Sequence, residues 1–293
     1  MKDNGRHSPM RPFLGKLVGI KDLATDIKLF QIELMEPEGE RAFANYQPGQ
    51  FAFVSALGVG EAPFGITSVP SRGKALEFGI NKLGGVTDAI HNLELGDVVG
   101  VRGPLGNWFP LNQPATDTGD IIKGKNIIVL GGGIGGAPLR PVINTILDNR
   151  GDYGHFTIFW AARNPSLLVF TDEYDTWRSA PDTQLHLTVD RGDDEWVSAG
   201  RNEGLITQLL EKVAPSPEDA VTITCGPPIM IRFVTLTLAK LGFSLDQMWT
   251  TLEARMHCGI GKCGRCNLGE KLICVDGPVF RQDHVAEFLE SFV

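Results

Sequence analysis

Four of the chain's five cysteines lie close together near its carboxyl end, in the run Cys258-GIGK-Cys263-GR-Cys266-NLGEKLI-Cys274. The first three follow the spacing C-x4-C-x2-C, which suits thiolate ligands wrapped around a 2Fe–2S cluster. Gly259, Gly261 and Gly264 permit positive φ angles, so backbone amides can approach the cluster sulfurs. We therefore predict that Cys258, Cys263, Cys266 and Cys274 ligate a 2Fe–2S cluster.

Alternatives to this cluster follow from the same residues. A structural zinc site usually shows two C-x2-C pairs, whereas this run contains one. A Rieske centre needs two histidines, and only His257 adjoins the run. An odd total of five cysteines, four of them clustered, also argues against a disulfide framework and favours metal ligation in a reducing compartment.

Two turns that follow apolar runs have the residues of a nucleotide site. Val129-Leu-Gly-Gly-Gly-Ile-Gly-Gly-Ala137 links a predicted strand to a predicted helix, where glycines and free amides favour a pyrophosphate. Cys225-Gly-Pro-Pro-Ile-Met230 ends another predicted strand. Each turn alone also fits an ordinary strand end, but together they predict a nicotinamide nucleotide site. Its expected residues are Gly131, Gly132, Gly133, Ile134, Gly135, Gly226 and Pro227, with Cys225 as the candidate catalytic group beside the nicotinamide.

The run Val189-Asp190-Arg191-Gly192 bears on the choice of nucleotide. A carboxylate at this place binds the 2′-hydroxyl of NADH, whereas a guanidinium binds the 2′-phosphate of NADPH. Asp190 favours NADH, and Arg191 together with Arg163 keeps NADPH open. Asp190 fits an exposed turn equally well.

The elements that would position these groups fall into two patterns. Residues 13–115 read as short strands with frequent turns and one short helix, which predicts an antiparallel β-barrel. Residues 122–250 alternate buried strands with helices, which predicts a doubly wound α/β domain with a parallel sheet. Residues 251–293 form the cluster segment and a tail, and the polar stretch 112–124 is the expected boundary between the first two domains.

Composition narrows the class of protein further. The net charge of −8 argues against a nucleic-acid surface. No apolar run reaches the roughly 18 residues of a membrane span, and no signal peptide opens the sequence, so we expect a cytoplasmic protein.

The order of barrel, G-G-G-I-G turn and C-G-P-P-x-M turn resembles the ferredoxin–NADP reductase superfamily. With the appended cysteine run, the chain is similar to flavoprotein subunits that carry a C-terminal 2Fe–2S cluster: sulfhydrogenase gamma subunits, the corresponding subunit of anaerobic sulfite reductase, and the electron-transfer subunit of dihydroorotate dehydrogenase B. The resemblance implies FAD between the two domains and a diaphorase-like exchange of electrons between NAD(P)H, FAD and the cluster. It also implies a partner redox subunit of hydrogenase, sulfite reductase or heterodisulfide-reductase type.

The flavin motif of that superfamily, R-x-[YF]-S, aligns with Ala62-Pro63-Phe64-Gly65 and departs from it at two positions. Ala62 replaces the arginine that would pair with the flavin pyrophosphate, and Gly65 replaces the serine. Backbone amides at Ile66 and Ser68 are the expected substitutes. A second motif, G-x-x-[ST], matches Gly84 to Thr87 at a helix start, where Thr87 also fits a plain cap. The resemblance thus implies flavin contacts from Phe64, Gly65, Ile66, Thr67, Ser68, Asn81, Gly84, Gly85, Val86 and Thr87.

Two other functions fit the same sequence. One is a non-catalytic electron relay or scaffold whose nucleotide site is vestigial, which the missing arginine favours. The other is the electron-transfer subunit of a dihydroorotate dehydrogenase.

Overall fold

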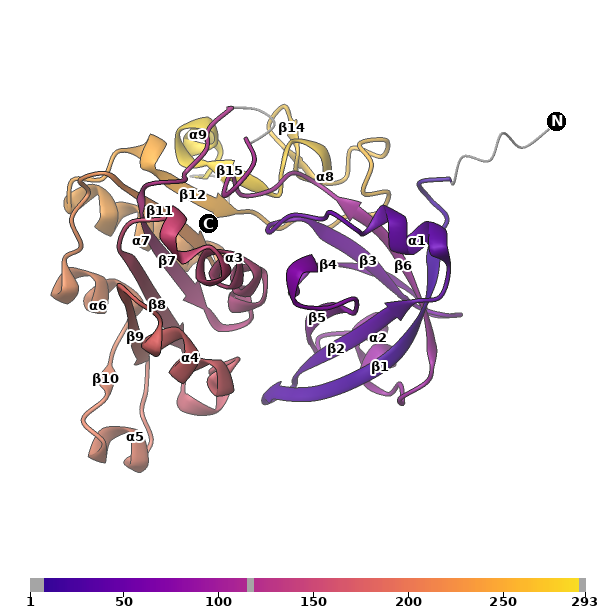
Figure 1. The fold of residues 1–293 in the computed structure, drawn as a ribbon, viewed down its shortest axis with the longest axis horizontal. Coiled ribbons are helices and arrows are strands. Elements are labelled where there is room, and N and C mark those ends of the chain that lie inside the picture. Colours follow the sequence, from indigo (N-terminus) through magenta and orange to yellow (C-terminus); the bar gives the residue numbers. More distant parts are fainter. Residues whose placement is uncertain (1–7, 115–118, 290–293) are drawn as a thin grey trace.

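The computed structural model describes residues 8–114 and 119–289 of the chain. An antiparallel barrel comes first, an α/β domain lies beside it, and the C-terminal segment runs along one edge of both (Figure 1). This arrangement confirms the fold class predicted from the sequence.

The barrel is a six-stranded antiparallel sheet with the strand order β4-β3-β6-β1-β2-β5. Its strands are β1 (Phe13–Ala24), β2 (Ile27–Leu34), β3 (Phe51–Ala56), β4 (Gly60–Gly65), β5 (Leu76–Asn81) and β6 (Val98–Leu105), with helices α1 (Pro37–Ala42) and α2 (Gly85–His91). Alternate residues of β1 are buried, beginning with Phe13, as expected for a strand with one face on a core. Aromatic side chains such as Phe30 and Phe78 fill that core.

The α/β domain contains a seven-stranded sheet of order β10-β9-β8-β7-β11-β12-β15. Its strands are β7 (Asn126–Gly132), β8 (Phe156–Ala162), β9 (Thr183–Val189), β10 (Asn202–Glu203), β11 (Ala220–Cys225), β12 (Met248–Thr251) and β15 (Val279–Arg281). Neighbours are parallel except β12 and β15, which are antiparallel. The sequence-based prediction did not identify β12 or β15.

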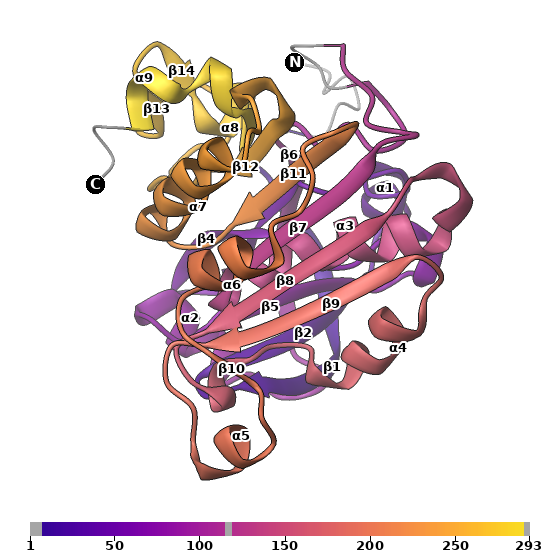
Figure 2. The ribbon, with the colours of Figure 1, turned by 90° about the vertical axis from the view of Figure 1, so that its left-hand side faces the viewer.

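Helices cover both faces of this sheet, as a doubly wound fold requires. They are α3 (Gly136–Asp148), α4 (Tyr174–Ser179), α5 (Asp194–Ser198), α6 (Ile206–Val213) and α7 (Pro228–Lys240). Helices α6 and α7 pack on the face turned away from the barrel (Figure 2). Helix α3 packs on the other face, in a cluster that also contains Leu23, Ile27 and Leu29 of the barrel.

The C-terminal segment is made of short elements: β13 (Asn267–Leu268), β14 (Lys271–Leu272), α8 (Ile273–Asp276) and α9 (Ala286–Leu289). Between α8 and α9 it returns to the main sheet as β15. This segment is therefore attached to the α/β domain at both ends of the cysteine run. In residues 8–114 and 119–289, no helix is long and apolar enough to cross a bilayer.

Charged side chains join the barrel to helix α3. Arg140 pairs with Glu77 of β5 and, at 2.6 Å, with Glu173. Arg72 pairs with Asp148 at 2.7 Å, and this contact also crosses from the barrel to α3. These contacts fix the two domains relative to each other, so residues from both can form one site.

Candidate functional site

The four cysteines of the C-terminal run come together in two pairs. The thiol of Cys258 lies within hydrogen-bonding reach of Cys263, and that of Cys274 within reach of Cys266. Cys258, Cys266 and Cys274 are buried, whereas Cys263 is exposed. Within the described part of the chain, no three His, Cys, Asp or Glu side chains converge on one ion position. Two adjacent thiol pairs suit two irons, and the residues therefore fit a 2Fe–2S cluster.

Backbone amides point at these sulfurs because the loop adopts left-handed turns. Gly259, Gly261 and Gly264 have φ angles of 70°, 74° and 68°. Four N–H groups donate to sulfur: those of Ile260, Lys262 and Cys263 to Cys258 Sγ at 3.5, 3.3 and 3.4 Å, and that of Gly261 to Cys274 Sγ at 3.2 Å. The Ile260 amide is the main cause that lowers the pKa of Cys258 to about 6. Such donors stabilise thiolate ligands and tune a cluster's potential.

Close packing holds the cysteine run against the barrel. A Cβ atom at Gly259 would lie 2.6 Å from Cε2 of Phe53 and 3.0 Å from Cδ1 of Leu105. Only glycine allows this approach together with the positive φ. Phe51 and Phe53 of β3 share one buried cluster with Cys266 and Cys274.

A cavity of about 250 Å³ opens between the barrel, the start of α3 and the residues that lead into the cysteine run. Its lining includes Phe64, Gly65, Asn81 and Thr87 of the barrel, Ile134, Ala137 and Pro138 of the nucleotide turn and α3, and Thr251, Leu252, Glu253, Ala254 and Met256. Mostly apolar walls with a few polar groups are typical of cofactor sites. The residues present fit a flavin ring in this cavity.

Four of the implied flavin residues line the cavity, namely Phe64, Gly65, Asn81 and Thr87. Others are buried or hydrogen-bonded within the barrel. Ile66, Thr67 and Ser68 are buried in the barrel. The Ile66 amide, which is expected to hold the flavin, donates to Gln50 O at 3.0 Å within the barrel. The Ser68 hydroxyl lies 2.7 Å from the hydroxyl of Tyr46.

Thr87, at the start of α2, is placed for both of its expected roles, which are capping the helix and contacting the flavin. Thr87 Oγ1 accepts hydrogen bonds from the amides of Leu83 at 2.8 Å and Gly84 at 2.9 Å, which caps the helix. Thr87 also lines the cavity. Gly84 and Gly85 are exposed, and Val86 is half-buried.

The two turns of the α/β domain are in direct contact. A Cβ atom at Gly135 would lie 2.7 Å from Cys225 O and 2.7 Å from Gly226 Cα. Gly131 and Gly132 end β7, and Pro227 immediately precedes α7. Gly133 has a φ of 56° and open space beyond its Cα. The structure thus brings the turns together and leaves one glycine of the first turn open to a ligand.

Cys225 lies behind the cavity rather than on its wall. It is 3% exposed, and the Thr251 hydroxyl donates to its Sγ at 2.8 Å. Burial raises the pKa of Cys225 to about 12, so the thiol is protonated at neutral pH.

Glu253 is a cavity residue that the sequence-based prediction missed. Its side chain has accessible surface because it faces the cavity, yet the protein around it desolvates the carboxyl and raises its pKa. An acidic residue that closely follows a buried four-residue strand is the signal that could have identified it.

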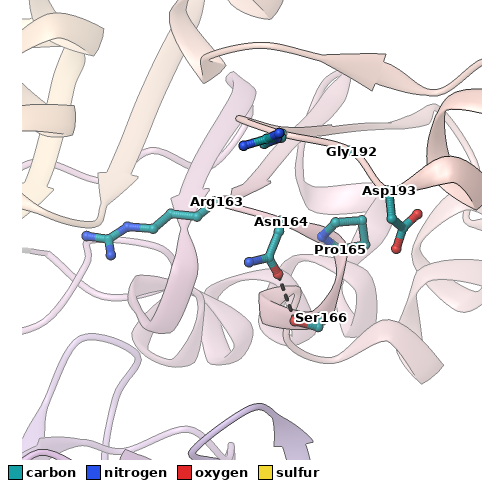
Figure 3. A pocket seen from close by; sticks show the side chains of 7 residues that line it. Arg163, Asn164, Pro165, Ser166, Gly192 and Asp193 are labelled. Carbon is teal, nitrogen blue, oxygen red and sulfur yellow. Dashed lines mark hydrogen bonds between the residues drawn. The ribbon is translucent and has the colours of Figure 1, made fainter.

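A second pocket, of about 370 Å³, lies beyond the carboxyl ends of β8 and β9. Its lining comprises Arg163, Asn164, Pro165, Ser166, Arg191, Gly192 and Asp193 (Figure 3). Asp193 caps α5 by accepting the Trp196 amide at 2.8 Å. Asp190 is exposed and is not part of the lining. Strand ends of this kind are where open α/β sheets bind nucleotides.

Comparisons with known proteins agree with this arrangement. Residues 129–235 match the oxidoreductase NAD-binding domain, and residues 253–286 match the iron–sulfur cluster binding domain of dihydroorotate dehydrogenase B. The chain is 36% identical to the gamma subunit of sulfhydrogenase 1 from Pyrococcus furiosus, over 90% of this chain and 89% of that one. It is 31% identical to a probable electron-transfer subunit of dihydroorotate dehydrogenase B (NAD(+)) from Methanocaldococcus jannaschii, over 85% and 84%. A solved structure of NADH-dependent reduced ferredoxin-NADP oxidoreductase shares the fold, with a TM-score of 0.73 at 24% identity over 98% and 95%.

Fold and site define an NAD(P)H-dependent oxidoreductase subunit with an iron–sulfur cluster segment, built on the ferredoxin reductase plan. The chain belongs to the family of electron-transfer subunits that includes the sulfhydrogenase gamma subunits and the electron-transfer subunits of dihydroorotate dehydrogenase B. It is an electron-transfer subunit of the type found in these redox complexes.

Proposed function

We propose that this chain is the cytoplasmic NAD(P)H-oxidising subunit of a hydrogenase-type or sulfur-reductase-type complex. The pyrophosphate of the nucleotide would lie along Gly131–Gly135 and its nicotinamide near Cys225–Pro227. The flavin ring would lie in the 250 Å³ cavity, and the cluster at the four cysteines. The names of its relatives, sulfhydrogenase subunits among them, support a partner of this type. Clustered thiols that need a reducing compartment support the cytoplasm.

One observation carries the proposal: three functional segments share the walls of a single cavity. Phe64 comes from the barrel, Ile134 from the nucleotide turn, and Met256 from the residues leading directly to Cys258. A flavin ring there would touch the nucleotide site on one side and the cluster segment on the other. This arrangement is what conversion between two-electron and one-electron transfer requires.

The bound cofactors supply hydride and single-electron chemistry, and the chain positions them. Phe64 and Ile134 would exclude water from the flavin ring. Glu253, with its raised pKa, can hold a proton at the cavity wall at a pH where an exposed carboxyl is ionised. The amides on Cys258 Sγ would stabilise the anionic ligand set of the cluster.

Purification of the full chain without air, followed by assay of flavin, iron and sulfide, tests this assignment. NAD(P)H should bleach the flavin band at about 450 nm and then produce the EPR signal of a reduced 2Fe–2S cluster. A chain that binds flavin and cluster but that neither nucleotide reduces would support the relay with a vestigial nucleotide site instead. Copurification with a dihydroorotate-binding subunit would favour the dihydroorotate dehydrogenase complex.

The second pocket favours NADPH over NADH. In residues 8–114 and 119–289, the structure shows no ion pair for the guanidinium groups of Arg163 and Arg191, and both residues line this pocket. Two free guanidinium groups beside a strand end suit a 2′-phosphate. In Figure 3 the Arg163 side chain extends away from Asp193, so the carboxylate does not neutralise it.

The double variant Arg163→Ala/Arg191→Ala tests this preference. Each exposed charge contact is worth about 1 kcal/mol, so kcat/KM for NADPH should fall by roughly 30-fold while that for NADH changes little. Arg178→Ala, which removes an exposed arginine paired with Asp175 on α4, is the matched control. Equal losses with both nucleotides would count against a 2′-phosphate site.

A further inference from the structure

Arg102 of β6 is a buried charged side chain to which none of the sites above assigns a role. It is 2% exposed and sits at the wall between the barrel and the cysteine run. Its Nη2 donates to Glu61 Oε1 at 2.6 Å, and its guanidinium lies 4.2 Å from the centre of the Phe53 ring. Burying a guanidinium is unfavourable unless its partners are well placed. The presence of a buried charge at this position therefore calls for a functional explanation.

The third contact of Arg102, with the cysteine run, supplies this explanation. Its Nη1 donates to the backbone carbonyl of Cys258 at 2.7 Å, in the buried interior. This carbonyl belongs to the first cysteine of the run. A positive charge from the barrel is therefore hydrogen-bonded to the backbone of a cluster ligand.

Asn107, just after β6, makes the corresponding contacts at the other end of the run. It is 2% exposed, and its Nδ2 donates to Asp276 O at 2.9 Å and Val279 O at 2.8 Å. Its Oδ1 accepts the Val279 amide at 2.9 Å, and its own amide donates to Gly277 O at 2.7 Å. The side-chain amide of Asn107 is thus occupied in holding residues 276–279.

We propose that Arg102 and Asn107 are positioning residues that clamp the cluster segment to the barrel wall. The short stretch from Arg102 to Asn107 hydrogen-bonds to the segment at two places. One is Cys258, the first cluster ligand, and the other lies just beyond Cys274, the last ligand. The clamp fixes the distance from the cluster to the cavity, and the guanidinium makes the reduced, more negative cluster more favourable. This inference rests on the flavin and cluster sites proposed above.

The test compares Arg102→Met, Arg102→Lys and Asn107→Ala with the wild-type full chain carrying FAD and cluster. Arg102→Met should lower the midpoint potential of the cluster in an EPR-monitored titration, and Arg102→Lys should restore much of the shift because it keeps the charge. In both Arg102→Met and Asn107→Ala, electrons should reach the cluster about tenfold more slowly in stopped-flow, since small misplacements have large effects on rate. Flavin content and the rate of flavin bleaching should stay at the wild-type level.

Arg72→Met is the matched control, because it breaks the Arg72–Asp148 ion pair between barrel and α3 without touching the cluster segment. It should leave the cluster potential and signal unchanged. Loss of the cluster from Arg102→Met with flavin retained would support the clamp.

If Arg102→Met fails to fold, Asn107→Ala decides. An unchanged signal, potential and transfer rate in Asn107→Ala would overturn the clamp. A wild-type chain that holds no flavin would overturn the proposed function, yet the shift in cluster potential would still test Arg102.

Discussion

Replacing Gly135 by alanine should disturb the contact between the two nucleotide turns. The new Cβ atom would lie 2.7 Å from Cys225 O, 2.7 Å from Gly226 Cα and 2.8 Å from Cys225 C. All three neighbours are backbone atoms, so no side-chain rotation relieves the overlap. Either β11 or the Gly131–Gly135 turn must move by several tenths of an ångström.

The size of the effect follows from overpacking in a well-packed interior, which costs about 1–3 kcal/mol. For a chain of this size, each kcal/mol lowers Tm by about 2–4 °C, so a loss of about 5 °C is expected. A displaced turn also presents its amides less well to the pyrophosphate. A loss of about 1.4 kcal/mol in binding raises Kd for NAD(P)H about tenfold.

The assay pairs thermal unfolding with nucleotide titration of the flavin-loaded chain. Gly151→Ala is the matched control, because Gly151 lies on the surface and a Cβ atom added there would have nothing within 4 Å. Flavin and iron content should stay normal in both variants. If Gly135→Ala and Gly151→Ala have the same Tm and the same Kd, the turns do not pack as tightly as described.

Two further variants probe Cys225, behind the cavity, and Glu253, on its wall. Cys225→Ala should slow hydride transfer while leaving the cluster intact, and an unchanged stopped-flow rate would remove Cys225 from the site. Burial raises the pKa of Cys225 to about 12. The wild-type rate should therefore show no pH dependence from ionisation of this thiol between about pH 6 and 9. Burial also raises the pKa of Glu253 above its usual value of about 4.5. The folded state is therefore favoured while Glu253 is protonated, and this contribution to stability is lost as pH rises from about 4.5 through the folded-state pKa. In Glu253→Gln the decrease of Tm with pH over that window should become shallower, and an identical slope would refute the raised pKa.

Some elements could be predicted from the sequence because their signal is local. Strands β2, β5 and β8 are apolar or alternating runs within the segments predicted to contain strands. Strands β12 and β15, of four and three residues, have too little pattern of their own. They form because each pairs with a neighbour in the sheet, and pairing partners far along the chain cannot be identified from a short window.

The same distinction applies to the site. The four cysteines are neighbours in sequence, so their spacing alone predicts a cluster. Arg102 and Asn107 act on residues 156 and 172 positions away, and neither stands in a motif that indicates this contact. The Ile66 amide is a different case, because the motif predicts a ligand role for an amide that already donates to Gln50 O within the barrel.

The cavity also bears on whether the nucleotide site is vestigial. Ala62 leaves the flavin pyrophosphate without the expected arginine, which is the argument for a relay that no longer oxidises a nucleotide. The ring end of the site does not depend on that arginine, because its walls come from Phe64, Ile134 and the residues before Cys258. Gly133 keeps open space where the pyrophosphate of a nucleotide would lie. Loss of the arginine contact at the flavin's phosphate end would lower flavin affinity but would leave the nucleotide, flavin and cluster sites next to one another. The geometry therefore supports a working site that holds its flavin more weakly.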